Sequence, residues 1–522
     1  MKKIIPTLFA SALALSLAGN ASAADDRYII KFKEGKGQAV KSMMEKNGGR
    51  SALALQKRNA MAANLPTKAL SALRNNPNVE YVEQDVKRFP LAETVPFGIP
   101  MVQADQLSDA MAGNQTVCII DSGYALNHED LPSGNVTGNY DTGTGDWFTD
   151  ENGHGTHVAG TIAAIGGNGK GVVGVNPNGN LNLHIVKVFG ADGWAYSSSL
   201  VAAADECAAN GATVINMSLG GTFKSRTEER AFADLYNQNV LSIAAAGNDG
   251  NTRHSYPASY DSVVSVAAID SNKMIADFSQ QTDQVELSGP GVDVLSSVPV
   301  GMGLSTTFSV SGSAIEAAGM DESPMGNVTG NLVDCGLGES ACAGAAGQIC
   351  LISRGNISFA DKVLACEAGG GIGAVIYNNE PGMLYGTMGG VATSIPSAGI
   401  SDTDGAALLG QLGSSANLAI EPSDYAYFNG TSMATPHVAG VSALVWSHFP
   451  SCSASQIRSA LTSTAEDLGA AGRDNAYGHG LVQAKAAVDY LTANGCGGSG
   501  GDGGDGGSGG GGKPCKGKNC TQ

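Results

Sequence analysis

Short apolar runs, separated by helix-like stretches, recur along the middle of the chain. Five of them are Val117–Ile120, Leu183–Val188, Thr213–Met217, Val240–Ala246 and Val263–Ala268. Runs that are apolar at almost every position are typical of strands buried on both faces. Because these strands alternate with helices, the pattern predicts an α/β fold in which a parallel sheet is flanked by helices on both faces.

The chain before this region has a different pattern. We expect strands at Tyr28–Phe32 and Val79–Val82, and short helices at Gln38–Lys46 and Lys68–Arg74. This order of short strands and helices predicts a small α+β unit. By itself, such a unit fits any ferredoxin-like module.

A third region interrupts the α/β pattern between residues 319 and 422. It is rich in Gly and Ala, contains Cys, and has expected strands of its own at Gly347–Ile352 and Ala374–Tyr377. We interpret it as an inserted domain. The α/β pattern resumes at Tyr427 and ends with an amphipathic helix near Val482–Leu491. The glycine-rich tail that follows has the low complexity of an unfolded segment.

The first residues have the features of a signal peptide. Two lysines precede an apolar run at residues 4–18, and the motif Ala21-Ser22-Ala23 fits a signal-peptidase site. No later stretch approaches the ~18 uninterrupted apolar residues of a transmembrane helix. We therefore expect a secreted, extracellular protein that passes through the periplasm and has no membrane anchor. Ten cysteines agree with that oxidising environment, and a formal net charge of −18 argues against a nucleic-acid partner.

Three glycine-flanked motifs contain the candidate catalytic residues. Asp121 directly follows the apolar run that ends at Ile120, and the carboxyl end of a strand is where open α/β sheets build their sites. His154 lies in Gly-His-Gly-Thr-His-Val-Ala-Gly and Ser432 in Gly-Thr-Ser-Met-Ala-Thr-Pro-His. Both precede expected helices, whose first turns expose free backbone amides. Each motif alone is weak evidence, but the three together are specific.

The three motifs, in the order Asp, His, Ser, resemble those of the subtilisin family. The resemblance covers most of Pro96–Gly319 and Asp424–Leu491. It implies a serine endopeptidase with Asp121, His154 and Ser432 as the catalytic triad. Protein and peptide substrates follow from it, and the chemistry would require no cofactor.

The resemblance also implies which residues surround the reacting bond. Asn248 follows the run Ala244–Gly247, and its amide would form the oxyanion hole together with the backbone N–H of Ser432. The substrate-binding residues would be Ser218, Leu219, Gly220, Ala245, Ala246, Gly247 and Ser255, the last at the floor of the pocket. Because these segments carry no charge, we expect an apolar or aromatic residue before the cut. Trp194 and Tyr196 would either shape a neighbouring pocket or belong to a plain surface loop.

The flanking regions also match parts of subtilisin-family precursors. The N-terminal unit resembles subtilisin propeptides at its Tyr-Ile-Ile-Lys-Phe start and its Val-Glu-Tyr-Val-Glu-Gln-Asp end, which implies an intramolecular inhibitor and a self-processed zymogen cleaved between about residues 88 and 96. The insert resembles a protease-associated domain at Ile349–Gly355 and Phe359–Lys362. Such inserts are linked to substrate access or partner binding, and a purely stabilising role is the alternative.

We accordingly divide the chain into six parts and expect a monomer. They are a signal peptide (1–23), a propeptide (24–92), the first part of the catalytic domain (93–318), the inserted domain (319–422), the second part of the catalytic domain (423–495) and a glycine-rich tail (496–522).

Cysteine pairing and metal binding are less constrained by the sequence. Among the many possible connectivities we expect Cys335–Cys342, Cys350–Cys366, Cys452–Cys496 and Cys515–Cys520, which leaves Cys118 and Cys207 either bonded or buried. The resemblance allows a structural calcium ion at Asp141–Asp150, but the spacing fits no EF-hand loop. The turn Gly166–Gly171 also differs in length from the family's usual calcium loop. We expect His157 and His437 to pack between helices and not to bind a metal.

Two rival functions are weaker. An esterase-type hydrolase would place its serine in a Gly-x-Ser-x-Gly elbow, which Gly-Thr-Ser-Met-Ala lacks. A non-enzymatic scaffold would not need an intact triad and an oxyanion residue.

Overall fold

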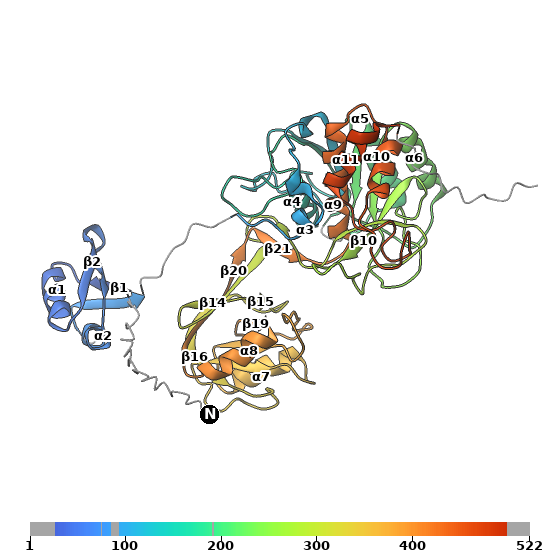
Figure 1. The fold of residues 1–522 in the computed structure, drawn as a ribbon. Coiled ribbons are helices and arrows are strands. Elements are labelled where there is room, and N and C mark those ends of the chain that lie inside the picture. Colours follow the sequence, from blue (N-terminus) through green and yellow to red (C-terminus); the bar gives the residue numbers. More distant parts are fainter. Residues whose placement is uncertain (1–26, 75, 85–92, 191–192, 498–522) are drawn as a thin grey trace, which may run out of the picture. The chain divides into compact units, whose positions relative to one another are not determined.

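The computed structural model describes residues 27–74, 76–84, 93–190 and 193–497 (Figure 1). These belong to two compact units, one within Met1–Pro90 and the other within Leu91–Gln522. The expected signal peptide, most of the expected propeptide cleavage region and nearly all of the tail, with Cys515 and Cys520, lie outside the described residues.

The first unit is an antiparallel sheet of order β2-β3-β1-β4 with two helices. Its elements are β1 (Arg27–Phe32), α1 (Gly37–Lys46), β2 (Arg50–Leu55), β3 (Ala60–Asn64), α2 (Thr67–Arg74) and β4 (Val79–Gln84). Its core contains the buried side chains of Ile30, Val40, Met44 and Leu73. The α+β class expected from the sequence is present. The pattern missed β2 and β3, because β2 has no buried side chain along its length and β3 is mainly alanine.

The second unit contains a seven-stranded parallel sheet of order β11-β10-β9-β8-β5-β7-β6. The strands are β5 (Thr116–Asp121), β6 (Val136–Tyr140), β7 (Asn182–Lys187), β8 (Val214–Met217), β9 (Leu241–Ala245), β10 (Val263–Ile269) and β11 (Val285–Pro290). All five strands predicted from apolar runs belong to this sheet, and the predicted α/β fold is confirmed.

Helices cover both faces of this sheet, because successive strand residues point to opposite sides. In β5, Val117 and Ile119 belong to one hydrophobic core, whereas Cys118 and Ile120 belong to the other. The helices of the first core are α4 (His154–Ala163), α9 (Thr431–His448), α10 (Ala454–Ser463) and α11 (Ala484–Asn494). Those of the second are α5 (Ser197–Ala209) and α6 (Arg226–Asn237). A short helix, α3 (Gly98–Met101), lies near the start of the unit.

The inserted region forms a mixed eight-stranded sheet of order β14-β13-β20-β16-β17-β18-β19-β15. Its elements are β13 (Gly303–Val310), β14 (Ser313–Ile315), β15 (Ala318–Gly319), β16 (Gly326–Asp334), β17 (Ile349–Ser353), α7 (Phe359–Ala368), β18 (Gly373–Tyr377), β19 (Ser397–Ile400), α8 (Asp402–Leu408) and β20 (Ser415–Ser423). β13 pairs antiparallel with β20 over its whole length, so this sheet begins before residue 319. A two-stranded antiparallel sheet is formed by β12 (Val294–Ser297), which precedes β13 in the sequence, and β21 (Tyr425–Phe428), which follows β20.

Four disulfides join described residues. They are Cys118–Cys207, Cys335–Cys342, Cys350–Cys366 and Cys452–Cys496. The last three are pairs expected from the sequence, and the first links β5 to α5. Among the helices of the described ranges, none is both long and apolar enough to cross a bilayer.

Candidate active site

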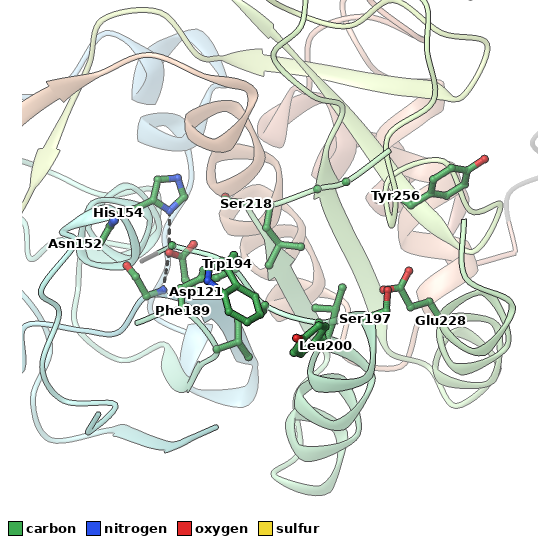
Figure 2. Close-up of a pocket in the computed structure, with 18 of the residues that line it drawn as sticks. Asp121, Asn152, His154, Phe189, Trp194, Ser197, Leu200, Ser218, Glu228 and Tyr256 are labelled. Atoms are coloured by element: carbon green, nitrogen blue, oxygen red, sulfur yellow. Dashed lines mark hydrogen bonds and ion pairs between the residues drawn. The ribbon is translucent and has the colours of Figure 1, made fainter. Parts of the chain in front are cut away.

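Buried Asp121 and partly exposed His154 form an acid–imidazole pair at the carboxyl end of the parallel sheet. Asp121 is the last residue of β5 and is fully buried, and His154 is the first residue of α4. His154 Nδ1 lies 2.7 Å from Asp121 Oδ1, and the backbone N–H of Ser122 donates to the same oxygen at 2.8 Å (Figure 2). Burial lowers the pKa of His154, but the carboxylates of Asp121 and Asp150 together outweigh this effect, so the pKa lies above its ordinary value. The acid therefore orients the ring and favours its charged form.

The loop before His154 is fixed by a second carboxylate, that of Asp150. Asp150 Oδ1 accepts from Ser122 Oγ at 2.9 Å and from the backbone N–H of Gly153 at 2.8 Å. Asp150 Oδ2 accepts from the backbone N–H of Thr156 at 2.9 Å and from its hydroxyl at 2.6 Å. These bonds tie the strand end at Asp121 to the helix start at His154.

A buried lysine holds the same loop from the other side. Lys187 ends β7 next to Asp121 in the sheet and is fully buried. Its Nζ donates to the backbone oxygen of Thr149 at 3.0 Å and to Glu151 Oε2 at 2.5 Å. The lysine ammonium holds the pKa of Glu151 below its ordinary value. The loop at residues 149–153 is thus bonded to Ser122 through Asp150 and to Lys187 through Thr149 and Glu151.

Ser432 lies in the first turn of α9, a helix of 18 residues. Its hydroxyl donates to the backbone oxygen of Ser218 at 3.1 Å, and the Ser218 hydroxyl donates to the backbone oxygen of Ser432 at 2.7 Å. The free amides and the dipole at a helix start favour negative charge. The serine therefore stands where an anion would be stabilised.

Asn248 and Ser432 present two nitrogens to one small space. Asn248 Oδ1 accepts from the backbone N–H of Thr431 at 2.9 Å and from its hydroxyl at 2.8 Å, which fixes the orientation of the amide. A Cβ on Gly430 would lie 3.3 Å from Asn248 Nδ2 and 3.5 Å from the backbone nitrogen of Ser432. Because Gly430 leaves this space open, a small anionic atom can approach both donors.

The segments expected to bind substrate lie beside these groups. Gly221 and Tyr256 exchange two backbone hydrogen bonds of 2.8 Å, which pairs the segment after Ser218 with the segment around Ser255. A Cβ on Gly220 would approach Ser255 Oγ within 2.5 Å. The backbone N–H of Gly247 donates to the hydroxyl of Thr431 at 3.2 Å. The structure thus brings the expected substrate segments close to Ser432.

A cleft of about 440 Å³ extends from Asp121 and His154 along the segment 218–221 (Figure 2). Trp194 and Tyr196 line it, with their rings edge-to-face at 5.0 Å. Of the residues expected from the sequence to bind substrate, Ser218, Leu219 and Gly220 line this cleft, and the others lie outside its lining. Residues that the sequence did not single out also line it, among them Asn152, Phe189, Phe223, Glu228 and Tyr256.

Two further histidines near the site are buried and hydrogen-bonded to backbone. His157 Nε2 lies 2.9 Å from the oxygen of Val294, and His437 Nδ1 lies 2.9 Å from the oxygen of Met433. Burial lowers the pKa of His157 to about 3 and that of His437 to about 4. Both rings are therefore neutral. The ring of His157 stacks on Phe428 of β21 at 4.4 Å, so it packs against strands and not between helices as expected from the sequence.

Candidate metal ligands are few in the part of the chain that the structure describes. There, the cluster of side chains close enough to share an ion is Cys335, Cys342 and Cys350, whose sulfurs are in disulfides. In the acidic stretch Asp141–Asp150, both oxygens of Asp150 already accept protein hydrogen bonds. Among the described residues, no group of three acidic or histidine side chains, from this stretch or elsewhere, lies close enough to share an ion.

The parallel sheet, the Asp–His pair and the serine at a helix start together define a serine peptidase of the α/β class. A model of the Subtilase family matches residues 112–322 and 403–480, and a PA domain model matches residues 328–408. The chain therefore belongs to the subtilase family, and it is a subtilase serine endopeptidase with an inserted PA domain.

Individual relatives agree with this assignment. Subtilisin DY of Bacillus licheniformis is 32% identical over 403 residues, which cover 76% of this chain and 99% of that protein. An alkaline protease of Alkalihalobacillus alcalophilus is 29% identical over 498 residues, which cover 92% and 96% of the two chains. The crystal structure of the psychrophilic subtilisin-like protease Apa1 from Pseudoalteromonas sp. AS-11 matches with a TM-score of 0.67 and 48% identity, over 78% of this chain and 100% of that chain.

Proposed function

We propose that this chain is a secreted serine endopeptidase, made as a self-processed zymogen, which cuts proteins through an acyl-enzyme on Ser432. The observation that carries the proposal is the hydrogen bond of 2.7 Å between His154 Nδ1 and Asp121 Oδ1. This bond fixes the tautomer of His154 that leaves Nε2 free to accept a proton.

In the proposed reaction His154 acts first as a base and then as an acid. Ser432 Oγ attacks the peptide carbonyl carbon while His154 Nε2 takes the hydroxyl proton. Before that step the hydroxyl turns away from the backbone oxygen of Ser218, to which it donates a hydrogen bond of 3.1 Å. The imidazolium then gives its proton to the leaving amine as the C–N bond breaks. Water, activated in the same way, hydrolyses the acyl-enzyme and restores Ser432.

Asn248→Ala should lower kcat about 10²–10³-fold, the loss measured for the equivalent donor in a subtilisin, because Asn248 Nδ2 and the Ser432 N–H would hold the oxyanion of the tetrahedral intermediate. Initial rates on a peptide anilide provide the measurement, and KM should change little because the charge develops only in the transition state. Asn251→Ala, in the same loop, is the matched control and should retain kcat. A wild-type kcat in Asn248→Ala would contradict the oxyanion role.

The substrate would bind as an extended strand between the segments Ser218–Gly220 and Ala245–Gly247. The side chain before the cut would enter a neutral pocket with Ser255 at its floor, so apolar or aromatic residues are preferred there. This specificity is broad, because backbone hydrogen bonds do not depend on the substrate's sequence.

The proposal extends to maturation and location. The unit at residues 24–92 would act as an intramolecular inhibitor until the enzyme removes it, and the signal peptide at 1–23 would direct export. Four disulfides among the described residues suit an oxidising compartment. The mature enzyme would act as a monomer without a cofactor, and we propose no step through calcium.

Secretion of the full chain followed by assay on casein and peptide anilides tests this function. We expect both substrates to be cleaved, the activity to be abolished by a serine-directed inhibitor, and initial rates to be retained in a chelator. A correctly matured protein that cleaves neither substrate would overturn the proposal.

A further inference from the structure

The cleft that begins at His154 ends at a buried acid, Glu228. This residue lies in the first turn of α6 and is 4% exposed, yet it lines the cleft together with Tyr256. Figure 2 shows Glu228 at the opposite end of the cleft from the Asp121–His154 pair. A carboxylate at the end of a substrate cleft is a candidate specificity residue.

The ordinary structural role for a glutamate at this helix position is only partly present. A glutamate three residues after an N-cap serine usually accepts from the N-cap backbone N–H. Here the Ser225 N–H donates to Tyr260 Oη at 2.9 Å, and Tyr260 in turn donates to Glu228 Oε2 at 2.8 Å. Burial raises the pKa of Tyr260 and Glu228 raises it further, so the phenol remains a donor. Tyr260 thus accepts the hydrogen bond from the Ser225 N–H that Glu228 would ordinarily accept, and it donates its own hydroxyl to one oxygen of the Glu228 carboxylate.

The carboxylate of Glu228 has no ion-pair partner among the described residues. Among the ion pairs of the described residues, none includes Glu228, and the nearby Lys224 is paired with Glu229 at 2.7 Å. A buried charge without a counter-ion is unfavourable, because the protein replaces its hydration only in part. An incoming cation would therefore be stabilised at this end of the cleft.

The walls of the cleft suit a long side chain with a charged end. Trp194, Tyr196, Leu219 and Phe223 line it, and three of them are exposed aromatic residues. Lysine and arginine have aliphatic stems that pack on apolar surfaces, and an arginine head also stacks on aromatic rings. Such a stem would cross the apolar part of the cleft before its head reached Glu228.

The geometry of an extended peptide indicates which substrate residue would reach Glu228. Alternate side chains of a strand point to the same side. If the residue before the cut enters the pocket at Ser255, the second and fourth residues before the cut face the other side. The second would lie at the His154 end of the cleft, so the fourth would extend towards Glu228.

We propose that Glu228 selects substrates with Lys or Arg at the fourth position before the cut. This inference rests on the proposed endopeptidase function and adds a second determinant to the neutral pocket before the cut.

Two capped peptide anilides test it, acetyl-Arg-Ala-Pro-Phe-p-nitroanilide and its counterpart with Leu in place of Arg. The wild-type enzyme should show a kcat/KM about tenfold or more higher on the Arg peptide, as expected for a charge-assisted hydrogen bond. Glu228→Gln keeps an acceptor for Tyr260 but removes the charge, so the ratio should fall to about one. Glu229→Gln, which removes a half-exposed carboxylate one residue away, should keep the wild-type ratio.

The outcomes separate this inference from the function on which it rests. If the wild-type enzyme cleaves neither peptide, the endopeptidase function fails. If it cleaves both at similar rates, or if Glu228→Gln keeps the Arg preference, the function stands and the role of Glu228 is wrong. A purely structural role would lower the thermal stability of Glu228→Gln and leave the ratio unchanged, which would also overturn the proposal.

Discussion

Ser432→Ala should lower kcat/KM on peptide substrates about 10⁶-fold, the loss in kcat that follows removal of the triad serine in a subtilisin. Alanine has no hydroxyl to form the acyl-enzyme, whereas Asn248 Nδ2 and the backbone N–H at position 432 remain. If maturation is self-cleavage, the variant should also accumulate with its N-terminal unit attached. Gel analysis and initial rates from a protease-free host measure both effects.

Ser442→Ala is the matched control, because it makes the same substitution on the same helix. The Ser442 hydroxyl is buried and donates to the backbone oxygen of Val438 at 2.7 Å, away from the cleft. Its loss should lower the free energy of unfolding by about 1 kcal/mol and leave maturation normal. Normal maturation of Ser432→Ala would contradict self-processing, and wild-type peptidase activity in that variant would contradict the catalytic role of the serine.

Asp121→Asn should lower kcat about 10⁴-fold, because an amide at this position no longer fixes the tautomer that leaves His154 Nε2 free. The pH dependence gives a second readout. His154 must be neutral to act as a base, and Asp121 raises the pKa of His154 above its ordinary value. Activity of the wild-type enzyme should therefore fall as the pH drops through that raised pKa.

In Asp121→Asn the acid limb of the pH–rate profile should move to lower pH, because the charge that raised the pKa of His154 is gone. Asp146→Asn, an exposed position in the acidic stretch before His154, should keep both the rate and the profile. A large loss of rate with an unmoved acid limb would mean that Asp121 does not act through the charge of His154.

The sequence predicted the parallel sheet and the positions of the catalytic motifs because both depend on local signals. Asp121 directly follows a run that is buried in β5. His154 follows Gly153 at the start of α4, and Ser432 lies two residues after Gly430 in the first turn of α9. A parallel sheet places the ends of its strands at one edge. The meeting of Asp121 and His154 therefore follows from motifs that lie 33 residues apart.

The sequence did not reveal Glu228. Its surroundings, Arg-Thr-Glu-Glu-Arg, are typical of a solvated helix face. The burial of Glu228 depends on Tyr260, which lies 32 residues further on and supplies the hydroxyl hydrogen bond. A polar helix pattern contains no information on such a tertiary contact.

Pairing between residues far apart in the chain could not be predicted from the sequence either. β13 contains the polar run Ser305–Thr307 and pairs with β20 on the far side of the inserted region. Similarly, the Cys118–Cys207 bond joins residues 89 positions apart, and ten cysteines allow many alternatives. Only the fold brings these partners together.

The reactive serine is tested most directly by mass spectrometry of the mature enzyme after labelling with a fluorophosphonate. We expect one adduct per chain, on the peptide that contains Ser432, and complete loss of peptidase activity in step with labelling. An adduct on a different residue, or full activity in enzyme labelled at Ser432, would contradict the proposed catalytic centre.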